Sequence, residues 1–217
     1  MTMFTSQSNT FVFLQKHALL PKIENATNES DRAFLMKFSE TFKFTTTLLP
    51  IKSVGVQGDA RTYSHVVCLS SSEEPKGLEW LEVSKFAKLV PKICHNVNRV
   101  CYVFGEPIAF PVNDVTETHL TPHVLATLRE ADSLAHKVLK ERGYHRSVAQ
   151  MPVILIPIHF DRDVVSSAKE PSCQRSIVIR TFITEDFMTG VPAIPDKHIP
   201  FEVSTHSIIL FIHLILY

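Results

Sequence analysis

The chain has 217 residues, of which 45% are hydrophobic and 20% are charged, and this composition is typical of a globular protein with one or two domains. It carries 22 basic and 22 acidic side chains, so the formal net charge is zero and no basic excess is available to bind phosphate backbones. Nucleic-acid binding is therefore disfavoured. The six glycines are too scattered for a G-x-G-x-x-G turn or a Walker phosphate loop, which excludes two large classes of nucleotide-binding protein. Thirteen prolines argue against one long helical bundle and favour mixed α and β structure.

The first elements along the chain are an apolar patch and a helix. The patch, residues 11–14, is too short for a signal-peptide core and no charged segment precedes it, so we expect a cytosolic protein. From residue 30 to residue 44, apolar side chains recur at spacings of three and four. This spacing predicts a short amphipathic helix that begins near Ser30 or Asp31.

A β-hairpin is predicted next. Residues 51–57 and 62–70 are rich in β-branched and aromatic side chains, and the G-D-A sequence between them has turn chemistry. We therefore expect Asp59 and Arg61 at the tip of this hairpin. There they could offer a carboxylate acceptor and donors to a purine or ribose edge.

A helix and a strand follow the hairpin. Residues 78–90 place their apolar side chains on one helical face, and residues 99–104 have the composition of a strand. Hairpin, helix and strand together predict one compact α/β unit. Residues 124–142 then carry the strongest helical stripe of the chain, which Gly143 ends.

The second half of the chain repeats the hairpin pattern. Residues 151–160 and 176–183 are apolar and β-branched, and a polar turn separates them. We therefore expect an α/β (α+β) fold of two similar small subdomains, each a short β-sheet packed with helices.

The second subdomain is predicted to be incomplete. A helix and a third strand should follow Val203 if the repeat is genuine, but the sequence has an apolar run there, residues 207–217, which only His213 interrupts. The run is well short of the roughly 20 residues that a membrane-spanning helix needs, so we expect no membrane anchor, while weak membrane association of an apolar terminus stays an open alternative. As a strand it would be an exposed aggregation risk. We interpret residues 204–217 as a tail foreign to the fold.

Two groups of residues resemble reactive sites. The chain has four cysteines, Cys68, Cys94, Cys101 and Cys173. They form no C-x-x-C pair and lie in apolar runs, which favours buried free thiols. Cys94 and His95 resemble a thiol-protease pair by composition only, because a fold normally brings such residues together from distant positions. A helix C-terminus with capping asparagines is the favoured interpretation.

A metal cluster is the other alternative. His159, Asp161 and Asp163 alternate at the end of a predicted strand, as ligands of one metal ion can. Arg162 lies between the carboxylates and can neutralise them, and no helical His pair accompanies them. A polar turn is therefore favoured, and we expect no metal site and no catalytic residue.

Three single residues are weak signals by themselves. Gln150 opens the second hairpin and offers one amide. Arg175 and Arg180 could bind an anion, or could pair with Glu185 and Asp186 on the surface.

Several long motifs, in order, resemble a known family. They are LLPIKSVGVQGDARTY at residues 48–63, CHNVNRV at 94–100, QMPVIL at 150–155, HFDRD at 159–163 and SCQRS at 172–176. Together they resemble the C-terminal region of animal-type glutamine-hydrolysing GMP synthetase, and the resemblance covers roughly residues 17–203.

The resemblance implies a division of the chain. Residues 1–16 do not match, residues 17–145 form the first C-terminal subdomain, residues 146–203 form the incomplete second subdomain, and residues 204–217 are the foreign tail. It also implies a dimerisation domain that contributes to the site for xanthosine monophosphate (XMP). The expected partners are XMP and a second copy of this chain or other GMP synthetase subunits.

The resemblance assigns two substrate contacts. In the family, the Asp of the V-Q-G-D turn and the Gln before M-P-V contact XMP, and they correspond to Asp59 and Gln150. A Lys and a Glu of a K-P-P-x-T-x-E-W-E segment also contact XMP, but residues 204–217 replace that segment here. The family makes GMP from XMP, ATP and glutamine. This chain has neither the S-G-G-x-D-S loop nor the G-x-C-x-G elbow of the other domains. We therefore expect no cofactor on this chain alone, and ATP and magnesium only in the full enzyme.

Overall fold

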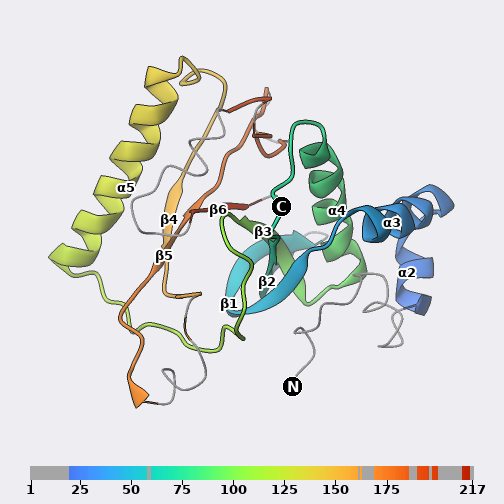
Figure 1. Cartoon of the computed structure of the whole chain (residues 1–217), viewed down its shortest axis with the longest axis horizontal. Coiled ribbons are helices and arrows are strands. Elements are labelled where there is room, and N and C mark those ends of the chain that lie inside the picture. Colours follow the sequence, from blue (N-terminus) through green and yellow to red (C-terminus); the bar gives the residue numbers. More distant parts are fainter. Residues whose placement is uncertain are drawn as a thin grey trace.

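A computed structural model describes residues 20–57, 60–160, 162, 169–185, 190–195, 197–199 and 212–215. The elements in chain order are α2 (Leu20–Ala26), α3 (Glu29–Thr41), β1 (Thr45–Gln57), β2 (Ala60–Ser70), α4 (Glu79–Ile93), β3 (Val97–Val103), α5 (Pro122–Glu141), β4 (Val153–Ile156), β5 (Ser176–Ile179) and β6 (Ile212–Ile215). Figure 1 shows helices α2, α3 and α4 grouped beside the first strands and α5 beside β4 and β5. The predicted α/β class is confirmed.

The strands form a sheet in the order β1-β2-β3-β6-β5-β4. β1 and β2 are an antiparallel hairpin, and β3 returns parallel to β2 after the α4 crossover. β4 and β5 form a second antiparallel hairpin, and β6 lies parallel to β5. The pairing of β3 with β6 is antiparallel and joins the two halves. Each half therefore consists of a hairpin with a parallel third strand.

The structure corrects the interpretation of the tail. The sequence predicted that the second unit lacks both its last helix and its last strand. For the strand, this prediction is wrong. Residues 212–215 form β6, which pairs with β3 through Cys101 and Ile215 and with β5 through Ile177 and Ile212. β6 is also not an exposed edge strand, because both of its edges are hydrogen-bonded. Between β5 and β6, the residues that the structure describes form bends, turns and isolated bridges rather than a helix.

The helices of the first unit cover one face of β2 and β3. α3 was predicted, and Asn28 caps its N-terminus through a 2.7 Å hydrogen bond from the Asp31 backbone N–H to Asn28 Oδ1. The shared core is aromatic: Phe38 of α3 stacks on Phe86 of α4 with ring centroids 4.5 Å apart. Alternate residues of β3 point to opposite faces, so Tyr102 lies in this core while Cys101 lies in the core on the other face.

The second unit has its own helix. α5 was predicted in almost its full length, and Gly143 follows it with φ +79°, a conformation that favours glycine. Val138 and Leu139 of α5 pack with Ile177 and Ile179 of β5 in a third core. α5 therefore covers the half of the sheet that the second hairpin forms. Among the described helices, none is both long enough and apolar enough to cross a membrane.

Candidate functional site

The predicted tip of the first hairpin is the strongest candidate site. The β1–β2 register continues to the pair Gln57 and Ala60, so the second strand begins two residues earlier than the sequence predicted, and Arg61 lies within it rather than at the tip. Asp59 lies outside the described residues. Arg61 is exposed on β2 and is paired with Val56 of β1.

The outer half of this hairpin projects beyond the neighbouring strand. β2 pairs with β3 only from His65 onward, so residues 60–64 of β2 have no partner pair in β3. Two irregularities precede the projection. In β1, residues 49–51 face a single residue of β2, and Pro50, which has no N–H, is among them. In β3, Asn98 is an extra residue between the pairs His65–Val97 and Val66–Arg99. Bulges of this kind bend a strand and redirect side chains.

Gln150 lies in the other unit. Its side chain is exposed, as a substrate contact requires, and it immediately precedes the second hairpin. Its backbone forms an antiparallel bridge with Phe182, with a 2.8 Å hydrogen bond from the Phe182 N–H to the Gln150 carbonyl. This bridge fixes the backbone of Gln150 at the sheet edge opposite to β1.

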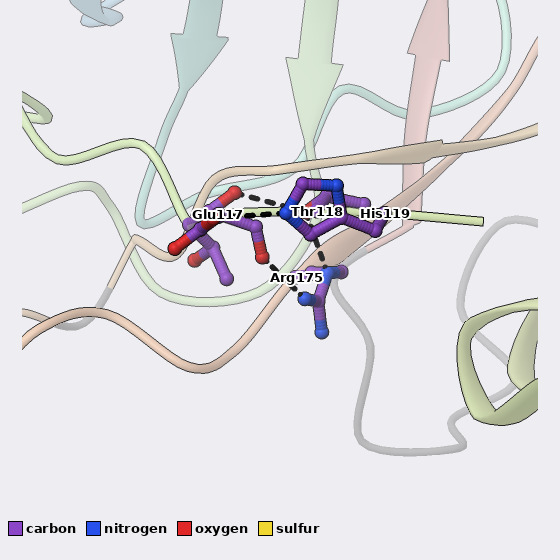
Figure 2. A network of polar contacts seen from close by, with 5 residues as sticks. Glu117, Thr118, His119 and Arg175 are labelled. Carbon is purple, nitrogen blue, oxygen red and sulfur yellow. Dashed lines mark hydrogen bonds and ion pairs between the residues drawn. The ribbon is translucent and has the colours of Figure 1, made fainter. Parts of the chain in front are cut away.

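Arg175 and Arg180 form contacts that the sequence did not predict. Figure 2 shows Arg175 directed at the connection that precedes α5. Its Nε donates to Thr118 Oγ1 at 2.8 Å and its Nη2 donates to the Glu117 carbonyl at 2.7 Å. The Arg180 guanidinium lies over the Phe182 ring, 6.0 Å from the centroid. Arg175 therefore holds a loop in place.

The predicted metal alternative gains no support from the described residues. Asp161 and Asp163 lie outside them. Among the described residues, Arg162 contacts two others: its Nε donates to Asp114 Oδ2 at 2.9 Å, and its Nη2 donates to the Glu170 carbonyl. Within the described ranges, no three His, Cys, Asp or Glu side chains are arranged to hold a metal ion.

The prediction of buried free thiols is confirmed at two positions. Cys68 and Cys101 are buried on the paired strands β2 and β3, with their Sγ atoms 2.7 Å apart. Burial raises the pKa of the Cys68 thiol well above its usual value. Cys173 is exposed, so the prediction is wrong there, because its run is a loop rather than a strand.

The thiol-protease alternative is not supported. Cys94 caps the C-terminus of α4 and its N–H donates to the Val90 carbonyl, so the predicted helix end is confirmed, although the capping residue is not an asparagine. Burial raises the pKa of Cys94, and the positive charge of Lys22 opposes this only in part. A thiol with a raised pKa is a poor nucleophile at neutral pH.

One hollow on the surface lies away from all of these residues. It has a volume of about 810 Å³ and lies between the end of α3, the loop after β2 and the start of α4. Two of its three carboxylates have partners: Glu79 accepts from the Lys76 N–H at 2.7 Å, and Glu74 accepts from the Gly105 N–H at 2.9 Å. These contacts order the loop, and Glu79 in the first helical turn disfavours an anion at this N-terminus.

Comparisons with known proteins agree with the resemblance to GMP synthetase, but they do not distinguish its C-terminal region or its animal type. No family profile matches the chain. The chain is 42% identical over 183 residues to a Caenorhabditis elegans protein named "Probable GMP synthase", glutamine-hydrolyzing, a match that covers 80% of this chain and 24% of that protein. It is 43% identical over 166 residues to the glutamine-hydrolyzing GMP synthase of Dictyostelium discoideum, covering 71% of this chain and 22% of that protein. A Leptospira interrogans protein of the same name is 31% identical over 144 residues. The chain thus spans about a quarter of the length of these relatives, and over most of its own length it is similar to proteins named GMP synthase.

Proposed function

We propose that this chain is a fragment of GMP synthase that supplies dimerisation and part of the XMP site. The observation that carries the proposal is the 42% identity over 183 residues, which covers most of this chain. The extent of the hairpin and the exposure of Gln150 are consistent with it. The activity belongs to the whole ligase, which forms GMP from XMP with ATP and glutamine-derived ammonia.

Asp59 and Gln150 are the proposed XMP contacts. A carboxylate accepts hydrogen bonds, so Asp59 is suited to an N–H of the purine or to a ribose hydroxyl. The Gln150 amide both donates and accepts, so it can recognise a carbonyl beside an N–H group. We assign no catalytic step to either residue. The sequence motifs for ammonia release and adenylation are absent from this sequence, and the chain should be catalytically silent alone.

A calorimetric titration of XMP into the chain tests this proposal. We expect saturable binding by the wild type and an affinity at least about tenfold lower in Asp59→Ala, because a hydrogen bond to a charged group is worth roughly 1.5–3 kcal/mol. Asp132→Ala is the matched control: Asp132 lies on α5 with a side chain 52% exposed, and its loss changes the net charge equally. Failure of the folded wild type to bind XMP would contradict the proposed substrate role.

A second candidate function is pairing alone. Val54 and Tyr63 lie opposite each other on β1 and β2 and are 44% and 65% exposed, which leaves an apolar pair on the outer hairpin. In this alternative the fragment pairs with full-length GMP synthase subunits and has no substrate role.

Co-expression with a tagged full-length GMP synthase tests the pairing function. We expect the untagged chain to co-purify with the tagged subunit, and Tyr63→Ser to reduce the recovered amount, since removing an exposed aromatic side chain weakens an interface without emptying a core. Leu120→Ser is the control, because Leu120 is also exposed, at 86%, but lies far along the chain, before α5. Strictly homotypic assembly would reject this alternative.

A further inference from the structure

A side chain of β3 supports the projecting half of the first hairpin. Asn98 is 7% exposed, and its amide nitrogen donates to two carbonyls, Ser53 at 2.8 Å and Thr62 at 3.0 Å. Its Oδ1 accepts a hydrogen bond from Thr62 Oγ1 at 3.0 Å. Ser53 belongs to β1 and Thr62 to β2, so one buried amide connects both strands of the hairpin to β3.

The bulge in β3 explains this orientation. Regular pairing continues on either side of Asn98, and the extra residue has no partner of its own in β2. A bulged residue is free to direct its side chain away from the regular alternation. Asn98 therefore reaches the hairpin strands at the level where backbone pairing with β3 has ended.

Gly55 makes room for this amide. A Cβ atom at Gly55 would lie 2.6 Å from Asn98 Cγ and 2.7 Å from its Oδ1, closer than non-bonded atoms approach. Asn98 cannot easily move aside, because three hydrogen bonds hold its amide. Glycine at residue 55 therefore leaves the space that the Asn98 amide occupies.

Arg99 adds a second support next to the first. Its Nη2 donates to the Val54 carbonyl at 3.2 Å. Two neighbouring residues of β3 therefore contact neighbouring residues of β1. Asn98 contacts Ser53 and Gly55, and Arg99 contacts Val54. Beyond these contacts the hairpin continues for only a few residues, to the pair Gln57 and Ala60.

We infer that Asn98 is a positioning residue for XMP binding, which fixes the direction of the outer β1–β2 hairpin, between whose strands Asp59 lies in the sequence. The inference rests on the proposed function, in which Asp59 of that turn contacts XMP. Asn98 is not proposed to touch the substrate itself. It acts through the backbones of Ser53 and Thr62, and its partner Gly55 is required for its fit.

The test combines amide hydrogen exchange with XMP titration on Asn98→Ala in the full chain. We expect exchange in residues 53–64 to accelerate and the XMP affinity to fall by about tenfold, because loosening a contact group misplaces it relative to its ligand. Ser176→Ala is the control: it removes one buried hydrogen bond, from Ser176 Oγ to the Ile158 carbonyl, in the other unit. It should lower the free energy of unfolding without changing hydrogen exchange in residues 53–64 or the XMP affinity.

A double substitution separates a specific fit from general damage. Gly55→Ala alone should disturb the hairpin, but Gly55→Ala combined with Asn98→Ala should be no worse than Asn98→Ala, because the clash partner is gone. Unchanged hairpin exchange in Asn98→Ala would overturn the inference, as would faster exchange with unchanged XMP affinity. Lack of XMP binding by the wild type would instead overturn the proposed function, while the exchange data would still decide whether Asn98 orders the hairpin.

Discussion

A Trp80→Ala variant should lose about 3–5 kcal/mol of unfolding free energy, the usual cost of removing a large buried aromatic side chain. Trp80 is fully buried in the first turn of α4, and its ring centroid lies 4.9 Å from that of Tyr102 and 5.7 Å from that of Phe104. The indole Nε1 has no hydrogen-bond partner among the described residues, so the loss reflects packing alone. The loss of unfolding free energy is measured by urea unfolding with circular dichroism as the signal, because the variant retains no tryptophan for fluorescence.

The neighbouring residue provides the control for this prediction. Leu81 follows Trp80 on the same helix but is 39% exposed, so Leu81→Ala should cost less than about 1 kcal/mol. Trp80→Phe should retain more than half of the lost stability, because a smaller ring still fills part of the site. Equal losses for Trp80→Ala and Leu81→Ala would contradict the packing of α4 on β3 described above.

Removal of residues 212–217 should divide the sheet into two weaker parts. β3 and β5 would both lose the neighbour that they share, which leaves β4 and β5 as an isolated hairpin. Two-stranded hairpins are at best marginally stable, and open strand edges promote aggregation. We therefore expect hydrogen exchange to accelerate strongly in β5, by about tenfold or more, while β2 stays protected by β1 and β3.

A point substitution tests the same pairing without shortening the chain. Leu214 pairs with Tyr102 of β3 and with Ile179 of β5, and a proline there lacks the one backbone N–H that this residue could donate within the sheet. Leu214→Pro should therefore reproduce the effect of the truncation, whereas Leu214→Ala retains the N–H and should preserve pairing. If truncation left the exchange of β5 unchanged, residues 204–217 would be foreign to the fold, as the sequence suggested.

Elements with local signals could be predicted from the sequence. α5 has a continuous apolar stripe and a glycine after its end, and the first hairpin has two β-rich runs around a turn. The second hairpin was predicted too long: its first strand covers only residues 153–156, since Pro152 and Pro157 border it. α2 was missed, because seven residues are too few for a periodic pattern.

The features that the sequence could not show depend on distant contacts. β6 has only four residues, and both partner strands are far away in the sequence, so no local pattern distinguishes it from an unrelated apolar tail. The sequence indicates only helix capping for the asparagines after Cys94, Asn98 among them, because the bulge that redirects Asn98 becomes visible only from the register of β2 and β3. Gln150 was placed correctly before the second hairpin, and its role stays a prediction.

The position of β6 has a consequence for folding kinetics. β1, β2, α4 and β3 are contiguous in the chain, so the first unit has mostly short loops to close and should form early during synthesis. β3 then keeps one unpaired edge until the last strand has been made, although that edge lies at the centre of the finished sheet. The slowest step should be the closure of this long loop. Until it occurs, the nascent chain exposes the edge most prone to pairing with another molecule.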